Sequence, residues 1–192
     1  MRGILVAACA LALSVSVAGP ASADQQKLND PKGDVYRVAD DGTQGDVKQG
    51  QVPNTDITRS VVKHGPRAVG IVVKYVKLKK NFSEYIQYDA ELRVPNQGIY
   101  HAQILIDPTL KTAGINFTDG HYETLDCANA VAKVHPDEGR VIARVPRKCL
   151  GNPEWIRFGA SALSLTKAGS KKAYVDNALS NGGLLTKKLF VG

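Results

Sequence analysis

The stretch "YIQYDAELRVPNQGIYHAQILI" (Tyr85–Ile106) decides the fold class, because apolar and polar residues alternate along both of its halves. A period of two is typical of a half-buried β-strand, whose successive side chains point to opposite faces. The "PNQG" segment between the halves has the composition of a tight turn. The apolar positions of the first half are Ile86, Tyr88, Ala90, Leu92 and Val94, and those of the second are Ala102, Ile104 and Ile106.

Similar short segments on both sides extend this pattern to most of the chain. They are separated by turn sequences at intervals of about 8–12 residues, which is typical of antiparallel sandwiches and barrels. We therefore predict an all-β protein, an antiparallel and jelly-roll-like β-sandwich. A short helical turn near Asp176 to Leu179 is the one helical element that we expect. The further predicted strands are "DITRSVVKH" (56–64), "AVGIVVKYVKL" (68–78), "LKTAGINF" (110–117), "AVAKV" (130–134), "RVIARV" (140–145) and "WIRFGASALSL" (155–165).

The N-terminus has the features of a secretory signal peptide. Arg2 precedes an apolar run, and "ASA" ends at Ala23 with the small residues of a cleavage site. The run is too short for a permanent membrane span. An alternative is lipidation of Cys9 in "VAAC", but only eight residues precede this cysteine. The sequence thus predicts a secreted protein with residues 1–23 as signal peptide, 24–55 as a polar Asp- and Gly-rich leader, and 56–192 as the sandwich domain.

Cleavage after Ala23 leaves two cysteines, Cys127 and Cys149. An even pair in an exported protein predicts a disulfide, the alternative being two buried thiols. Cys149 stands where "RVIARVPRKC" meets the turn "LGNPE", and the chain returns through Trp155. A bond between the two would join the start of the preceding hairpin to the end of its second strand.

The chain is basic, with a formal net charge of +7. Basic surfaces favour anionic partners such as envelope polymers, nucleic acid or acidic lipids, although solubility alone also explains the charge. Lysines and arginines recur near tyrosines and Trp155 without forming a specific nucleic-acid motif, so the sequence does not favour nucleic acid. Carbohydrate or an anionic cell-envelope polymer is the partner class that we expect, and the sequence does not determine the oligomeric state.

Acidic residues alternate with glycine in "DPKGD" and "DDGTQGD", before Asp56 at the first long strand. Calcium binds six to eight oxygens from carboxylates and loop carbonyls, and glycine-rich turns can supply such a set. The best candidate ligands are Asp30, Asp34 and Asp56. The alternative is that these aspartates only cap turns.

Other chemistry has weaker support in the sequence. No histidine pair has the spacing of a zinc site, and we place His64 and His135 in turns and His101 on the polar side of its strand. No G-x-S-x-G nucleophile sequence is present. Asp89 and Glu91 share the polar face of one strand, as a pair of glycosidase carboxylates would, but so do the polar residues of any half-buried strand.

The segments "DPKGD", the later Asp56-Ile57, "VGIVVKYVKL" and "PRKCLGNPEWIRF" together resemble uncharacterised secreted β-sandwich proteins of Gram-positive bacteria. More distantly, the layout is similar to carbohydrate-binding sandwiches of the DOMON type. This resemblance implies a jelly-roll-like sandwich with a bound cation and names no ligand.

Three hypotheses for the function follow. The first is a non-enzymatic extracellular binding module, stabilised by calcium, with sugar or cell-wall polymer as ligand. The second is a hydrolase of envelope polysaccharide that uses carboxylates such as Asp89 and Glu91. The third is a secreted protein-binding or inhibitor domain.

Overall fold

The computed structural model describes residues 23–38, 47–96, 98–166, 172–178 and 185–192. Within these ranges the chain forms β-strands and two short 3-10 turns, η1 (Pro136–Glu138) and η2 (Arg147–Leu150). No described helix is long and apolar enough to cross a bilayer. The predicted signal peptide with Cys9, and the aspartates at 40, 41 and 46, lie outside the described residues.

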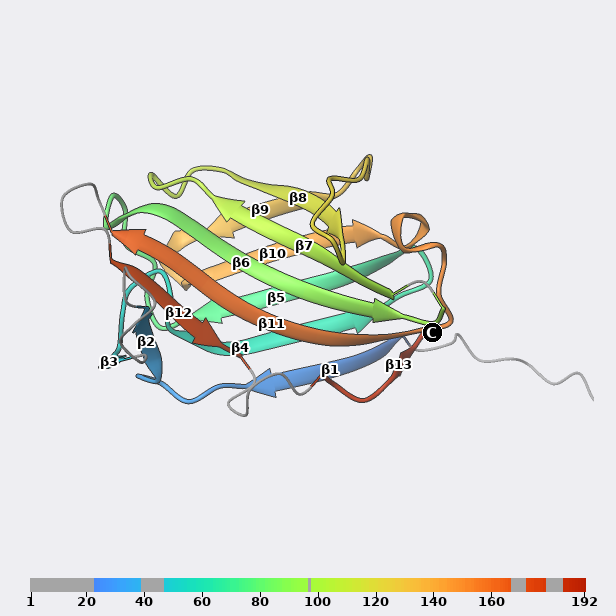
Figure 1. Ribbon diagram of the computed structural model, residues 1–192, viewed down its shortest axis with the longest axis horizontal. Coiled ribbons are helices and arrows are strands. Elements are labelled where there is room, and N and C mark those ends of the chain that lie inside the picture. The colour runs from blue at the N-terminus through green and yellow to red at the C-terminus, as the bar shows by residue number, and fades with distance from the viewer. Residues whose placement is uncertain (1–22, 39–46, 97, 167–171, 179–184) are drawn as a thin grey trace, which may run out of the picture.

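The strands form two antiparallel sheets (Figure 1). The five-stranded sheet consists, in order, of β1 (Asp24–Asn29), β4 (Ile57–His64), β5 (Ala68–Tyr75), β10 (Arg140–Pro146) and β9 (Val131–His135). The eight-stranded sheet consists, in order, of β3 (Val47–Gly50), β2 (Val35–Val38), β12 (Ala173–Asn177), β11 (Trp155–Thr166), β6 (Ser83–Val94), β7 (Gly98–Ile106) and β8 (Ala113–Asp119), with β13 (Leu189–Phe190) paired to β11.

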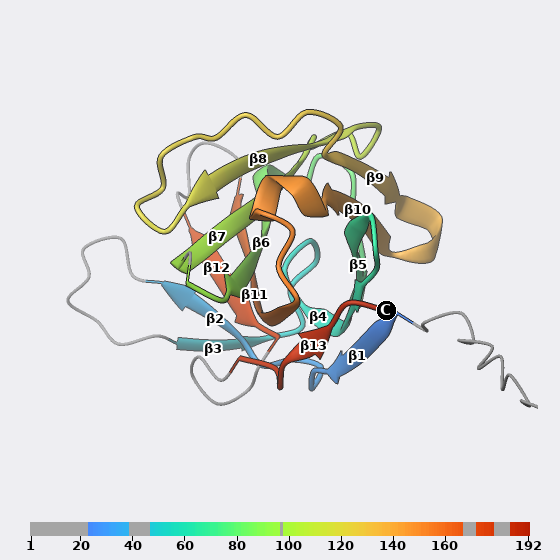
Figure 2. The ribbon, with the colours of Figure 1, turned by 90° about the vertical axis from the view of Figure 1, so that its right-hand side faces the viewer.

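The two sheets pack face to face around one hydrophobic core, as Figure 2 shows. The predicted antiparallel sandwich is therefore confirmed. The alternation of β6 places Ile86, Tyr88 and Leu92 at 1% exposure or less. Across the core, the Tyr88 hydroxyl donates a hydrogen bond to Oγ of Ser60 on β4, at 2.8 Å. This bond ties the middle of one sheet to the middle of the other.

Residues 24–55, predicted to be a polar leader, contribute β1, β2 and β3 to the two sheets. β1 pairs with β4 over its whole length, from Asp24 opposite His64 to Asn29 opposite Arg59. Hydropathy did not reveal this strand, because β1 lies at a sheet edge and buries only Leu28. Main-chain hydrogen bonds, which any sequence can make, hold it in place.

Two local expectations were wrong. The segment around Asp176 is the strand β12 and not a helical turn, since Ala173–Asn177 pairs with both β11 and β2. His135 ends β9 and His64 ends β4, where we expected turns, and His64 is fully buried. Its Nδ1 lies 2.8 Å from the carbonyl oxygen of Leu189, so the ring joins β4 to the C-terminal segment.

The predicted disulfide is present, with the Cys127 and Cys149 sulfurs 2.14 Å apart. Cys127 lies in the connection from β8 to β9, and Cys149 lies in η2 just after β10. The bond therefore holds the β9–β10 hairpin as expected. It also fixes the crossing between the sheets, because β8 belongs to one sheet and β9 to the other.

Candidate metal centre and a polar hollow on the outer sheet face

Four aspartates come together where β1, β2, β4 and β12 meet. Asp30 follows β1, Asp34 precedes β2, Asp56 precedes β4, and Asp176 lies within β12. One carboxylate oxygen from each of Asp30, Asp34 and Asp176 lies within 4.8 Å of the other two. Asp56 belongs to the same group, because its negative charge raises the pKa of both Asp30 and Asp176. We call these four residues the acidic cluster.

The local sequence explains how the cluster forms. The turn "DPKGD" between β1 and β2 passes through Gly33, whose φ of +78° suits glycine. The Gly33 N–H donates to Oδ2 of Asp56 at 3.0 Å, and the Ile57 N–H donates to Oδ2 of Asp176 at 2.6 Å. The turn and β12 are thus both attached to the first residues of β4.

Several carboxylate oxygens of the cluster are buried without a hydrogen-bond donor. Asp30 is only 7% exposed, and neither of its side-chain oxygens accepts from a donor; the carboxyl of Asp176 is within hydrogen-bond reach, but the two can bond only when one of them is protonated. Oδ1 of Asp34 and Oδ1 of Asp56 are likewise buried without a hydrogen-bond partner. No lysine or arginine among the described residues forms an ion pair with the cluster. Buried charges are normally paired or bound to a metal, so this arrangement calls for a counter-charge.

The pKa values of Asp30, Asp56 and Asp176 reflect the same burial. Burial raises the pKa of Asp30 to about 8, and the charges of Asp176, Asp34 and Asp56 add to the effect. Burial likewise raises the pKa of Asp176 to about 7 and that of Asp56 to about 6, against the opposing hydrogen bonds from Ile57 and Gly33. The raised pKa of Asp30 favours its protonation at neutral pH, and a bound cation would compete with that proton.

The donor set fits a hard divalent cation. Every side-chain ligand is a carboxylate oxygen, as calcium and magnesium prefer, whereas zinc sites are dominated by nitrogen and sulfur. Calcium–oxygen distances of about 2.3–2.6 Å allow ligand atoms up to about 5 Å apart around one ion. Oxygens within 4.8 Å of one another satisfy this limit.

Part of this site was predicted from the sequence. The structure brings the predicted ligands Asp30 and Asp34 together with Asp176, which sequence reasoning missed, while Asp56 lies outside this group of three and accepts a hydrogen bond from Gly33 of the same turn. Asp176 is a single acidic residue in a short strand, far along the chain from the other three. No local spacing could connect it to them.

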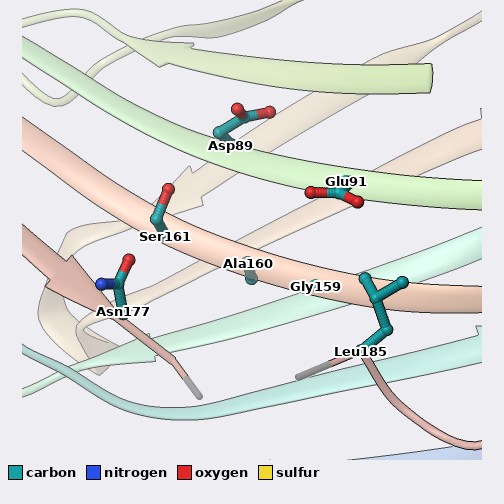
Figure 3. A pocket seen from close by; sticks show the side chains of 7 residues that line it. All are labelled: Asp89, Glu91, Gly159, Ala160, Ser161, Asn177 and Leu185. Atoms are coloured by element: carbon teal, nitrogen blue, oxygen red, sulfur yellow. The ribbon is translucent and has the colours of Figure 1, made fainter. Parts of the chain in front are cut away.

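A second feature, which we call the polar hollow, lies on the outer face of the eight-stranded sheet (Figure 3). It has a volume of about 130 Å³. Gly159 forms part of its floor, because a Cβ there would approach Leu185 to 3.0 Å. The hollow is lined by Asp89, Glu91, Gly159, Ala160, Ser161, Asn177 and Leu185.

Strand register extends the hollow into a row of polar side chains across five strands. Asn177 lies opposite Ser161, which lies opposite Asp89. Asp89 in turn lies opposite Gln103, and Gln103 opposite Asn116. Asn116 donates from Nδ2 to Oε1 of Gln103 at 2.9 Å, so these two side chains of the row contact each other. The row offers amide, hydroxyl and carboxylate groups in one line.

Asp89 and Glu91 share this outer face as predicted, and each has a partner of its own. Nδ1 of His101 lies 3.2 Å from both carboxylate oxygens of Asp89, and Nε of Arg93 lies 2.8 Å from Oε1 of Glu91. Burial raises the pKa of Asp89, while His101 opposes the shift. These contacts suit hydrogen-bond acceptors held in position better than a pair of free acid and base groups.

An aromatic ring stands beside this row. Tyr122 is 59% exposed and stacks on His101 with ring centroids 4.5 Å apart. Its φ of +63° is unfavourable for a bulky residue, and such strain is concentrated at functional sites.

No protein-family model matches the chain, and no curated protein matches its sequence. The acidic cluster and the polar hollow are therefore the features from which a function can be inferred.

Proposed function

We propose that this protein is an extracellular β-sandwich module that binds calcium at the acidic cluster. The observation that carries the proposal is Asp30, a buried carboxylate without a hydrogen-bond donor and surrounded by three other aspartates. A calcium ion would neutralise this charge and occupy the unpaired oxygens. Water and main-chain carbonyls would complete the six to eight oxygens that calcium requires.

Calcium in this position would act as a cross-link between the sheets. Asp30 and Asp56 are attached to β1 and β4 of the five-stranded sheet, whereas Asp34 and Asp176 are attached to β2 and β12 of the eight-stranded sheet. A ligand that binds only the folded chain stabilises it by mass action. Calcium would therefore hold β1, β2 and β12, which bury few apolar side chains, against the rest of the sandwich.

Thermal unfolding with and without calcium tests this proposal. At about 100 times the dissociation constant, calcium should stabilise the fold by about 2.7 kcal/mol, a rise in Tm of about 5–10 °C for a domain of this size. Magnesium should have less effect, because it needs shorter and more regular ligand distances. Isothermal titration calorimetry should give one site per chain.

The matched variants are Asp176→Asn in the cluster and Asp137→Asn in η1, where the carboxylate is exposed. Asp176→Asn should abolish the calcium-dependent rise in Tm, while Asp137→Asn should leave it unchanged. A chain that shows no change in Tm at saturating calcium, or whose response survives Asp176→Asn, would contradict the proposal.

The polar hollow favours a second function, the binding of a saccharide. Sugars present several hydroxyl groups in fixed directions and apolar C–H faces. The row from Asn177 to Asn116 offers matching donors and acceptors, and the exposed ring of Tyr122 offers a stacking surface. We infer that a neutral oligosaccharide would lie along this row, with Asp89 and Glu91 accepting hydrogen bonds from its hydroxyl groups.

Pull-down on insoluble cell-wall glycans and titration with soluble oligosaccharides test this second function. Ser161→Ala and Tyr122→Ala should each weaken retention, whereas Thr109→Ala in the β7–β8 connection should not. Retention without release of soluble sugar supports a binding module. Release of sugar that is lost in Asp89→Asn would support a hydrolase instead. If the variants keep both binding and release, the hollow is excluded as the site.

A further inference from the structure

The outer face of the five-stranded sheet carries many positive charges. Side chains that alternate away from the core on these strands are exposed or half-buried, and register places them on one surface. Three cations, Arg59, Lys74 and Arg140, lie directly opposite one another on β4, β5 and β10. We call the whole set the basic face, which comprises Lys27, Arg59, Lys63, Lys74, Lys133, Arg140 and Arg144.

This positive charge has almost no compensation within the sheet. The five strands contain a single acidic residue, Asp24. Asp24 lies opposite His64, on the side that faces inward, and accepts a hydrogen bond from the Phe190 N–H. At one end Glu138 pairs with Arg140 at 2.8 Å, and its carbonyl oxygen accepts from Lys74.

The remaining five cations of the basic face form no ion pair with any residue that the structure describes. Of these five, only Arg59 has a like charge directly opposite, Lys74, and like charges placed in this way destabilise a sheet. A surface that keeps such an arrangement is suited to an external anion. The five residues are Lys27, Arg59, Lys63, Lys133 and Arg144.

The basic face is hollowed between two of these cations. Lys63 and Arg144 lie on either side of Gly70, in register with it on β4, β5 and β10. Since neighbouring strands are about 4.8 Å apart, the two backbones are separated by about 10 Å. A Cβ at Gly70 would meet no atom within 4 Å, and a shallow depression of about 440 Å³ opens there, with Arg67 also at its margin.

We propose that the basic face binds a linear phosphodiester polymer of the cell envelope, which lies in the depression over Gly70. This goes beyond the calcium and saccharide functions and involves neither the acidic cluster nor the polar hollow. Lysine and arginine bind phosphate through charge-assisted hydrogen bonds, and cations spread over several strands match a chain with repeated charges. The depression is lined mainly by apolar atoms, including those of Pro66 and Ile142, so the carbon atoms of that chain would lie in it while its phosphates reach Lys63 and Arg144.

Two other polyanionic partners fit this face less well. Nucleic acid bound as a single strand is usually held by aromatic rings that stack on its bases, and the only aromatic side chain in these five strands, Tyr75, is buried. A membrane surface requires apolar side chains that insert between lipids, and among the exposed large hydrophobic residues only Val131 belongs to this sheet.

Binding of synthetic poly(glycerol phosphate), measured by fluorescence anisotropy over a series of salt concentrations, tests the proposal. The double variant Lys63→Glu/Arg144→Glu should bind at least about tenfold more weakly, with a shallower dependence on salt. The control Lys48→Glu/Lys111→Glu makes the same change in net charge on the eight-stranded sheet and the β7–β8 connection. It should bind within about twofold of the unchanged chain.

Two further variants separate charge from shape and guard against misfolding. Lys63→Gln/Arg144→Gln removes the charges without reversing them and should also weaken binding. Gly70→Val fills the depression without changing the charge and suits a strand, so it should keep the Tm while reducing affinity. Asp176→Asn should bind the polymer as the unchanged chain does, which separates this inference from the calcium proposal.

Several outcomes would overturn the proposal. Equal weakening in the face variant and in the Lys48/Lys111 control would show a general effect of net charge. Tighter binding to single-stranded DNA, or to vesicles of phosphatidylglycerol, than to poly(glycerol phosphate) would assign the face to nucleic acid or to membrane. Undetectable binding of the polymer at low salt would remove the proposed role altogether.

Discussion

Asp30 shows most clearly how a single residue constrains function in this protein. Its carboxylate loses hydration on folding and gains no donor in return, so the folded chain favours the protonated form. Its pKa rises from the ordinary aspartate value of 3.8 to about 8. Because the folded-state pKa is the higher one, the stabilising effect of protonation is complete below about pH 4 and is lost as pH rises toward 8.

The calcium-free protein should therefore lose the stabilisation that comes from protonated carboxyl groups between about pH 4 and pH 8, as Asp56, Asp176 and Asp30 ionise in turn. Calcium competes with these protons, so its effect should grow with pH. We expect a larger calcium-dependent rise in Tm at pH 8 than at pH 5, measured by calorimetry with calcium or a chelator. An equal rise at both values would argue against the acidic cluster as the site.

His64 should give the opposite pH dependence. Burial lowers its pKa from 6.5, and the hydrogen bond to Leu189 opposes the shift only in part. Because the folded-state pKa is the lower one, stability is complete above about pH 6.5 and is lost as pH falls below that value. His64→Gln should remove this acid-side loss from the pH profile of Tm, while the calcium-dependent increment stays the same. A profile identical to that of the unchanged chain would exclude His64 as its source.

Between the sheets, the bond from Tyr88 to Ser60 is a polar contact within an apolar core. Tyr88→Phe should lower the free energy of unfolding by about 1 kcal/mol, because the buried Ser60 hydroxyl loses its partner. The double variant Tyr88→Phe/Ser60→Ala should recover part of this loss, since no unpaired hydroxyl remains. Urea denaturation of the unchanged chain, the two single variants Tyr88→Phe and Ser60→Ala, and the double variant measures the coupling energy between the two residues. Strictly additive losses of unfolding free energy would show that the bond contributes nothing.

At the scale of elements, the turn between β1 and β2 determines whether the acidic cluster can form. Gly33 has a φ of +78°, and a Cβ there would have room, with Gln51 no nearer than 3.6 Å. Any effect of Gly33→Ala must therefore come from the backbone conformation. The expected loss is about 1 kcal/mol.

The same substitution should weaken calcium binding, because the turn carries Asp30 and Asp34 and its N–H holds Asp56. Titration calorimetry on Gly33→Ala should show lower affinity with unchanged stoichiometry. Gly114→Ala in β8, where a Cβ also has open space and φ is not positive, is the matched control. A loss of affinity in both variants would assign the effect to general loosening of the fold.

The disulfide acts on the β9–β10 hairpin and on the crossing from β8. It spans 22 residues, and loop-closure entropy gives such a bond about 3 kcal/mol of stabilisation. Cys127→Ser/Cys149→Ser should lower the free energy of unfolding by about this amount in urea titrations. The calcium affinity should stay the same, because the acidic cluster lies on other strands. A variant as stable as the oxidised chain would contradict the entropic account.

At the scale of the whole molecule, the sandwich is held by different means at different places. The β6–β11 region has a dense core and the β8–β9 crossing has the disulfide, whereas under the proposed function the β1–β2–β12 region would depend on calcium at the acidic cluster. Hydrogen exchange should report this division. Calcium should slow exchange in β1, β2 and β12 and leave β6 and β7 almost unchanged. Uniform slowing across all strands would show that calcium acts on global unfolding alone.

The charges are also divided between the two outer surfaces. The basic face covers the five-stranded sheet, while Asp89 and Glu91 lie on the opposite surface of the molecule, on the eight-stranded sheet. One module can therefore present a cationic surface to a phosphate polymer and a polar row to a neutral ligand at the same time.

The sequence by itself determined the parts of this protein that depend on local spacing. The period of two in β6 and β7 predicted the all-β sandwich, the pair Cys127 and Cys149 predicted the disulfide, and "DPKGD" located two members of the acidic cluster, Asp30 and Asp34. Each of these signals lies within a short segment, because side-chain direction along a strand and the composition of a turn are local properties.

Only the tertiary structure decided the remainder. It paired the polar segment β1 with β4, brought Asp176 to Asp30, and aligned Lys63, Gly70 and Arg144 into one hollowed surface. Strand order and register join residues that are distant along the chain, and hydrophobic burial of the whole core fixes that register. No local pattern around Asp176 or Gly70 carries this information.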